Sequence, residues 1–109
     1  MEKLDSDILK WIAERTGSPE LAAQIAAADV RKRDYMQTGF FVYLDTDRTL
    51  AAVPAGVRPV NPRIDGPGLM DGAGCTLFIR DGYLHYLEIY ARGGFFPAEG
   101  DDWQLSEES

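Results

Sequence analysis

The sequence predicts a single α+β domain in which an N-terminal helical hairpin packs on a mainly antiparallel β-sheet of about four to six strands. Two observations lead to this fold class. Helical periodicity and helix-capping residues are confined to the part of the chain before Val30. After Val30 the apolar residues form short β-rich runs joined in pairs by turns, and the strongest turn signal is Asp81-Gly82. We expect residues 1–97 to form this domain and residues 98–109 to form an acidic C-terminal tail.

Two helices are predicted before the first strand. Ser6 or Asp5 is a suitable N-cap for the first helix, and Gly17 is well placed to end it. The run Ser18-Pro19-Glu20 then starts a second helix, which extends to Ala28, in the usual order of cap, proline in the first turn and acid near the positive end. Because so few residues separate them, the two helices should form a compact αα-hairpin.

Four strands are predicted after the helices. Val30 to Met36 and Phe40 to Leu44 form a first hairpin, and Thr76 to Arg80 and Tyr83 to Ala91 form a second one. The stretch from Val53 to Gly74 is rich in proline and glycine, so we expect an irregular connection that holds at most short edge strands. Long connections of this kind often carry binding residues.

The turn at Asp81-Gly82 leaves two registers open for the second hairpin. A two-residue type I′ turn places on one face Leu77, Ile79, Leu84, Tyr86 and Glu88. A turn that includes Arg80, with a bulge at Gly82, instead groups Leu77, Ile79, His85, Leu87 and Ile89. The second register gives the more apolar face and is favoured. In it Glu88 lies on the opposite face, together with Thr76, Phe78, Leu84, Tyr86 and Tyr90.

Charge restricts the classes of partner. The chain has 11 basic and 18 acidic side chains and a net charge of −7, which repels nucleic acids and anionic membranes and attracts a basic protein. No basic residue follows Arg92, and the tail is acidic. Arg31-Lys32-Arg33 is too short a basic patch for a nucleic-acid surface. The chain has no run long enough to span a bilayer and starts without an apolar signal core, so we expect a cytoplasmic protein.

No complete catalytic or metal signature is present. Residues 41–49 are similar to the first motif of haloacid-dehalogenase-type phosphatases, which would make Asp45 a nucleophile and Asp47 an acid and base. That chemistry also needs a downstream lysine, and all three lysines precede Asp45, so a strand ending in a polar turn is the preferred interpretation. The chain has one histidine, His85, and one cysteine, Cys75, too few for a typical zinc site. We therefore expect neither an enzyme nor a bound cofactor or metal.

Glu88 is the strongest candidate for binding a small molecule. It lies between two apolar residues, where a carboxylate could anchor a ligand or act as a base in a minor enzyme. The candidate ligand-binding residues are Glu88, His85, Tyr86 and Tyr90. The structural alternative is a solvent-facing glutamate, or one paired with an arginine such as Arg80 or Arg92.

Aromatic residues are more numerous than one face of a sheet needs. They make up 11% of the chain and gather at 35–41 and 78–96, and tyrosine in particular is typical of interfaces. A surface for a protein partner or a homodimer follows as a hypothesis. The candidate partner-binding residues are Tyr83, Phe95, Phe96, Asp101, Asp102 and Trp103.

Four segments resemble a group of small uncharacterised bacterial proteins, some of which look like immunity proteins of toxin systems. These segments are 38–41, 72–74, 77–82 and 87–90, and the similarity covers about the last two thirds of the chain. The resemblance implies no catalytic residue. We expect a non-catalytic module that binds and masks a basic protein. The alternatives are a small-molecule binder or minor enzyme that uses Glu88 and His85, and a scaffold subunit of a larger assembly.

Overall fold

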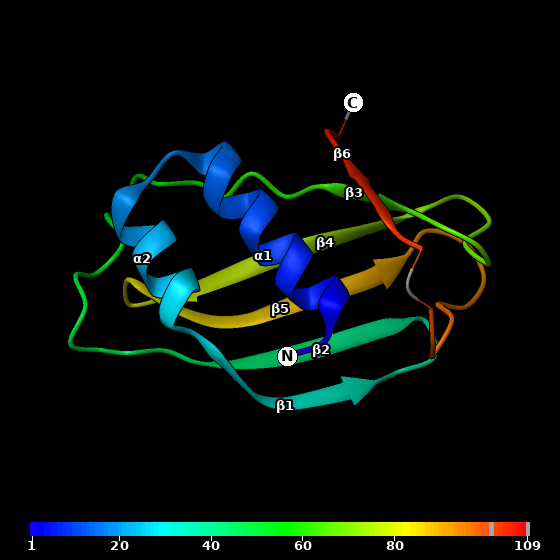
Figure 1. Ribbon diagram of the computed structural model, residues 1–109, viewed down its shortest axis with the longest axis horizontal. Helices are drawn as coiled ribbons and strands as arrows, with labels where there is room; N and C mark the ends of the chain where they lie inside the picture. Colours follow the sequence, from blue (N-terminus) through cyan, green and yellow to red (C-terminus); the bar gives the residue numbers. More distant parts are fainter. Residues whose placement is uncertain (101, 109) are drawn as a thin grey trace.

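The computed structural model describes residues 1–100 and 102–108, and over these residues it has the predicted α+β class. A helical hairpin lies on one face of a six-stranded antiparallel sheet with the strand order β1-β2-β5-β4-β3-β6 (Figure 1). The helices are α1 (Lys3–Thr16) and α2 (Pro19–Ala27). The strands are β1 (Asp29–Tyr35), β2 (Gly39–Asp45), β3 (Arg63–Asp65), β4 (Ala73–Arg80), β5 (Tyr83–Ala91) and β6 (Gln104–Ser106).

The first helix begins earlier than predicted. Its N-cap is Glu2, so the prediction of Ser6 or Asp5 is wrong. Burial explains the difference, because Leu4 in the first turn belongs to the core and Asp5 is fully buried in an ion pair with Arg33 instead of capping the helix. The helix ends, as predicted, at Gly17, whose φ of 72° is left-handed.

The second helix follows its sequence signals closely. The Ser18 hydroxyl accepts a hydrogen bond of 3.2 Å from the backbone N–H of Leu21, and Pro19 occupies the first turn. Leu21 and Ile25 on its inner side are buried. The predicted αα-hairpin is confirmed.

The strands agree with the predicted hairpins to within a few residues, apart from the two short edge elements. Gly39 begins β2 where a Cβ atom would collide with the carbonyl group of Ile89, so only glycine fits there. The proline-rich connection holds one short strand, β3, as expected. The acidic segment 98–109 contributes β6, which pairs with β3 at the edge of the sheet.

The β4–β5 hairpin combines features of both registers considered for it. Asp81 (φ 54°) and Gly82 (φ 83°) form a two-residue turn and Arg80 pairs with Tyr83, so the favoured turn with a bulge at Gly82 is wrong. The ladder skips His85 instead, because Ile79 pairs with Leu84 and Phe78 with Tyr86. This bulge turns both Leu84 and Leu87 into the core, which corrects the expected outward position of Leu84.

A fully buried glutamine joins the helical layer to the sheet. The Gln24 Nε2 atom of α2 donates to the carbonyl oxygens of Ala51 and Gly82, both at 2.9 Å, and its Oε1 atom accepts from the N–H of Leu84 at 3.1 Å. One side chain therefore satisfies backbone groups from the connection after β2, from the β4–β5 turn and from the start of β5.

Replacing this amide should be costly. Gln24→Leu preserves approximate size but leaves the Leu84 N–H without its partner, so we expect a loss of about 3 kcal/mol in the free energy of unfolding. Urea denaturation measures this loss. Ala23→Gln, on the exposed side of the same helix, should change stability by less than about 0.5 kcal/mol, and equal effects of the two variants would contradict the role given to Gln24.

Candidate functional site

One face of the sheet lies on the side away from both helices (Figure 1). On β5 the side chains of Leu87 and Ile89 point into the core, so Tyr86, Glu88 and Tyr90 point to the other side. The ladder pairs extend this surface across four strands. We call it the open face and define it by Lys32, Asp34, Phe41, Tyr43, Thr76, Phe78, Tyr86 and Glu88.

Aromatic rings form a continuous cluster on the open face. Tyr86 is its centre: its ring stacks on Phe78 with centroids 4.4 Å apart, and it lies 5.9 Å from both Tyr43 and Phe41. His85, at the bulge, packs edge-on against Tyr86 at 5.2 Å. The cluster thus joins β2, β5 and β4.

Three members of this cluster, Phe41, Tyr43 and Phe78, are not among the predicted site residues. Phe41 and Tyr43 were assigned to a strand but not to a surface, and Phe78 was placed on a face without a role. A signal was available, because Phe40, Val42 and Leu44 form an apolar row with period two that leaves the two intervening aromatic residues on the other side.

The tyrosines of the open face differ from other tyrosines in the hydrogen bonding of their hydroxyl groups. The hydroxyl groups of Tyr35 and Tyr83 donate to backbone carbonyls, at 2.6 Å and 2.9 Å. Among the described residues, no hydrogen bond is made by the hydroxyl groups of Tyr43 and Tyr86 or by the Glu88 carboxylate. These three groups are therefore available to a binding partner.

The arginines proposed as partners of Glu88 do not pair with it. Arg92 pairs with Glu108, and Arg80 forms no ion pair within residues 1–100 and 102–108. Tyr90 lies over Gly74, where a Cβ atom would meet its ring. All four candidate ligand-binding residues are thus close together along β5 and half-buried.

The candidate partner-binding residues are dispersed. Phe96 is fully buried, packed between Phe40 and Trp103, so its assignment to an exposed partner surface is wrong. Hydrogen bonds of its backbone explain this position. The Phe96 N–H donates to the carbonyl of Gln37, and the Phe96 carbonyl accepts from the hydroxyl of Tyr35, which holds the ring over the core. Phe95 is 67% exposed.

Of the four remaining candidates, Asp101, Asp102 and Trp103 belong to the C-terminal segment and Tyr83 does not. The Tyr83 hydroxyl is occupied by the carbonyl of Leu50, at the other end of β5. Trp103 is half-buried and Asp102 is exposed. Asp101 lies outside the described residues.

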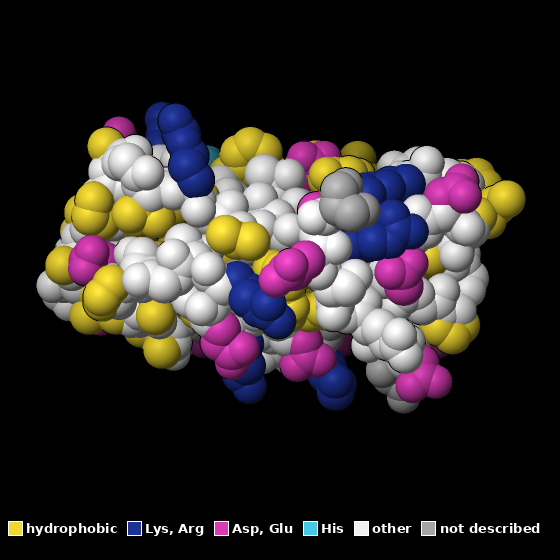
Figure 2. Space-filling view, turned by 90° about the horizontal axis from the view of Figure 1, so that it is seen from above, with side chains coloured by type: hydrophobic (Ala, Val, Ile, Leu, Met, Phe, Trp, Pro, Cys, Tyr) yellow, Lys and Arg dark blue, Asp and Glu magenta, His cyan; other side chains and the backbone are white. Residues whose placement is uncertain are grey.

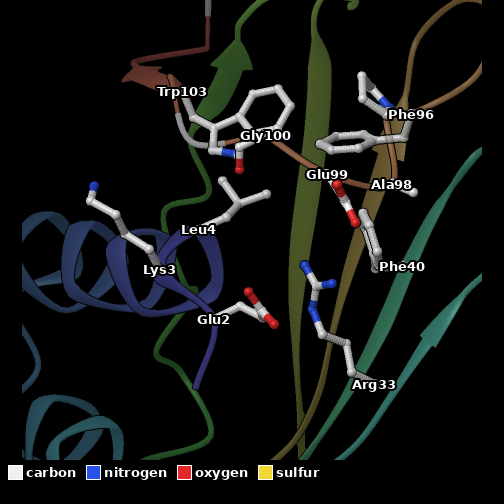
Figure 3. Close-up of a pocket in the computed structure, with 11 residues that line it drawn as sticks. Glu2, Lys3, Leu4, Arg33, Phe40, Phe96, Ala98, Glu99, Gly100 and Trp103 are labelled. Carbon is white, nitrogen blue, oxygen red and sulfur yellow. The ribbon is translucent and has the colours of Figure 1, made fainter.

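A second surface, the end pocket, is a hollow of about 460 Å³ between the start of α1 and the segment after β5. In Figure 3 the carboxylates of Glu2 and Glu99 lie on either side of the Arg33 guanidinium. The residues that line it are Glu2, Lys3, Leu4, Arg33, Phe40, Phe96, Pro97, Ala98, Glu99, Gly100 and Trp103.

Arg33 is fixed by two interactions in the end pocket. Its Nε and Nη2 atoms donate to the carboxylate of Asp5 at 2.8 and 3.2 Å, and its guanidinium lies 3.8 Å from the centroid of the Phe40 ring. Burial raises the pKa of Asp5 above its usual value, although Arg33 opposes this shift. The charge of Arg33 is balanced from within the protein.

The acidic C-terminal segment is attached to the domain by ion pairs. Glu107 pairs with Arg15 of α1 at 2.8 Å, and Glu108 pairs with Arg92 after β5. A view of this edge shows basic and acidic side chains intermixed (Figure 2). The segment therefore carries less unbalanced negative charge than the sequence alone indicates.

The remaining candidate chemistry has structural explanations. Asp47 accepts hydrogen bonds from the backbone N–H and hydroxyl of Thr49, at 2.9 and 2.6 Å, which lower its pKa and close a polar turn after β2. Cys75 is buried, and desolvation raises the pKa of its thiol to about 12. Within the described residues no His, Cys, Asp and Glu side chains gather in a group that could hold a metal ion, and no helix could cross a membrane.

Comparison with protein-family models, with curated proteins and with solved structures found no match to this chain. The resemblance to immunity-like bacterial proteins therefore stays a prediction.

The ion pair of the end pocket should behave asymmetrically. Arg33→Leu leaves a fully buried carboxylate unpaired, whereas Asp5→Leu leaves an arginine side chain that is 23% exposed. We expect about 3 kcal/mol of destabilisation for Arg33→Leu, a smaller loss for Asp5→Leu and near recovery in the double variant. The Arg33→Leu loss should shrink in acid, as Asp5 takes up a proton. Denaturation curves of the four proteins test this, and additive losses would contradict it.

The buried thiol predicts a stability change in alkali. The raised pKa keeps Cys75 neutral in the fold, while the unfolded chain ionises near pH 8.5, so its stabilising contribution is complete below about pH 8.5 and is lost as pH rises toward about 12. Free energies of unfolding measured across this range should fall more steeply for the natural protein than for Cys75→Ala. Parallel curves would mean that the thiol is accessible to water.

Proposed function

We propose that this protein is a non-catalytic protein-binding module and that the open face is its contact surface. The observation that carries the proposal is a set of polar groups, on Tyr43, Tyr86 and Glu88, that make no hydrogen bond among the described residues and lie inside an accessible aromatic cluster. Tyrosine rings offer large contact area at low entropic cost, and their hydroxyl groups need partners once buried. A protein surface can supply both the apolar contact and the hydrogen bonds.

The small-molecule alternative has less support. Such ligands bind in concave sites that enclose most of their surface. Five surface hollows formed by residues 1–100 and 102–108 are lined by other residues, and Glu88, His85, Tyr86 and Tyr90 line none of these five. A broad contact through these residues suits a macromolecule better.

A nucleic acid is a poorer occupant than a protein. Single-stranded binding sheets offer exposed ring faces on which bases stack, whereas Phe78 and Tyr86 stack on each other. The basic patch is also committed internally: Arg33 pairs with Asp5, Lys32 with Asp34 at 3.4 Å, and Arg31 lies 5.7 Å from the ring centroid of Tyr43. The net charge of −7 adds long-range repulsion.

A basic protein is the more specific form of the partner. Besides the net charge, the end pocket supports this choice, because Glu2 and Glu99 face the hollow and make no ion pair within the described residues. Trp103 supplies an aromatic wall beside them. A lysine or arginine of the partner could enter there, which would fit an immunity-like masking role in the cytoplasm.

Capture of the tagged full chain from its host lysate tests the proposal. We expect one co-purifying protein in stoichiometric amount, with affinity reduced at least about tenfold by Tyr86→Ala. If that protein is basic, Glu99→Lys and moderate salt should also release it. Met70→Ala is the matched control, because Met70 is 80% exposed and belongs to neither surface. Capture that is insensitive to Tyr86→Ala would show that the open face is not the contact.

A further inference from the structure

The open face consists of two rows of side chains on either side of a midline. The midline is set by the ladder partners Val42, Leu87 and Leu77, whose side chains point into the core. The row on one side holds Lys32, Tyr43, Tyr86 and Phe78. The row on the other side holds Asp34, Phe41, Glu88 and Thr76.

The two rows are chemically complementary, strand by strand. On β1 a cation, Lys32, is matched by an anion, Asp34. On β2 the two rows hold two aromatic rings, Tyr43 and Phe41. On β4 they hold the Phe78 ring and Thr76, whose methyl group is a surface against which a ring can pack. On β5 the hydroxyl donor of Tyr86 is matched by the carboxylate acceptor of Glu88. A two-fold rotation about the midline therefore brings each member of these two rows opposite its complement.

We propose that the open face binds a second copy of this chain, in a symmetric dimer whose two-fold axis runs along this midline. In that arrangement the Tyr86 hydroxyl of each copy donates to the Glu88 carboxylate of the other. Isologous contacts require self-complementary surfaces of this kind. The inference rests on the proposed function, since it takes the open face to be a protein contact. It makes a second copy, rather than a basic protein, the occupant of that face and leaves the end pocket as the surface for a basic partner.

The pairing gives partners to two polar groups that make no hydrogen bond among the described residues. Tyr86 and Glu88 are two positions apart on β5, and they do not bond each other within one copy. Across the interface the same two groups form two charge-assisted hydrogen bonds, which offset the cost of burying the carboxylates.

The other surfaces of the sheet are less suited to self-association. Edge β1 carries Lys32, Arg33 and Asp34 in succession and is interrupted at Arg31, which are features that oppose edge-to-edge pairing. The opposite edge, β6, has three residues. The molecule extends 39 by 29 Å across and is 19 Å thick, so its broad side is large enough for the ~800 Å² per partner of a standard interface.

Sedimentation equilibrium of the full chain at micromolar concentration tests the dimer. We expect a dimer for the natural protein, and at least about tenfold weaker association for Glu88→Lys, which removes the carboxylate that accepts from Tyr86, and for Tyr86→Glu, which sets two carboxylates against each other across the axis. Mixing the two variants should restore association. In the mixed dimer the introduced lysine faces the introduced glutamate, and the remaining tyrosine faces the remaining Glu88.

Glu14→Lys is the matched control, since it makes the same charge change on an exposed position of α1 and should leave the dimer intact. Circular dichroism of each variant confirms folding. A monomeric natural protein, or a dimer that neither variant weakens, would overturn the proposal. A monomer whose capture of another protein still depends on Tyr86 would overturn only the second copy as occupant, whereas loss of both results would remove the open face as a contact altogether.

Discussion

The placement of the two layers depends on the hydrogen bonds of one buried amide. Gln24 is fully buried, where an unpaired polar group is costly, and the groups it bonds are backbone atoms of the connection after β2 and of the end of the β4–β5 hairpin. Shifting α2 along the sheet by one turn would break all of these bonds together. The helical layer is therefore held in one register, and the same bonds fix the turn that β4 and β5 share.

The bulge at His85 decides the character of both faces of the sheet. A two-residue turn alone would have placed Leu84 and Leu87 on opposite sides of β5. The extra residue allows both to enter the core and moves Tyr86 and Glu88 together to the side without helices. The aromatic cluster thus exists because the bulge, three residues after the turn, reverses the alternation of inward and outward side chains along β5.

Signals between neighbours in the sequence predicted most of the fold, and contacts between residues far apart in the sequence account for the errors. Ser18, Pro19 and Gly17 act through neighbouring backbone groups, so their roles could be inferred from the sequence. The start of α1 could not, because Asp5 is engaged by Arg33 from a strand 28 positions away. The pairing of β6 with β3 likewise joins segments about 40 residues apart that have no periodic pattern of their own.

The candidate site was predicted in part for the same reason. Glu88, Tyr86 and Tyr90 lie on one strand with a clear alternation, and the structure brings them to one surface. Their neighbours Phe41 and Phe78 come from other strands, and only the register makes them adjacent. Phe96 was predicted to lie on a partner surface because the aromatic residues exceed what one sheet face needs, but its backbone returns the ring to the core.

The two-sided character of β5 has a consequence for how this chain can change over evolutionary time. Substitutions at Leu87 or Ile89 act on folding, whereas those at Tyr86 or Glu88 act on the surface with little effect on the core. Recognition and foldability are thereby separated residue by residue along a single strand. A lineage carrying this domain could acquire a new binding specificity through a few surface changes, each starting from a chain that already folds.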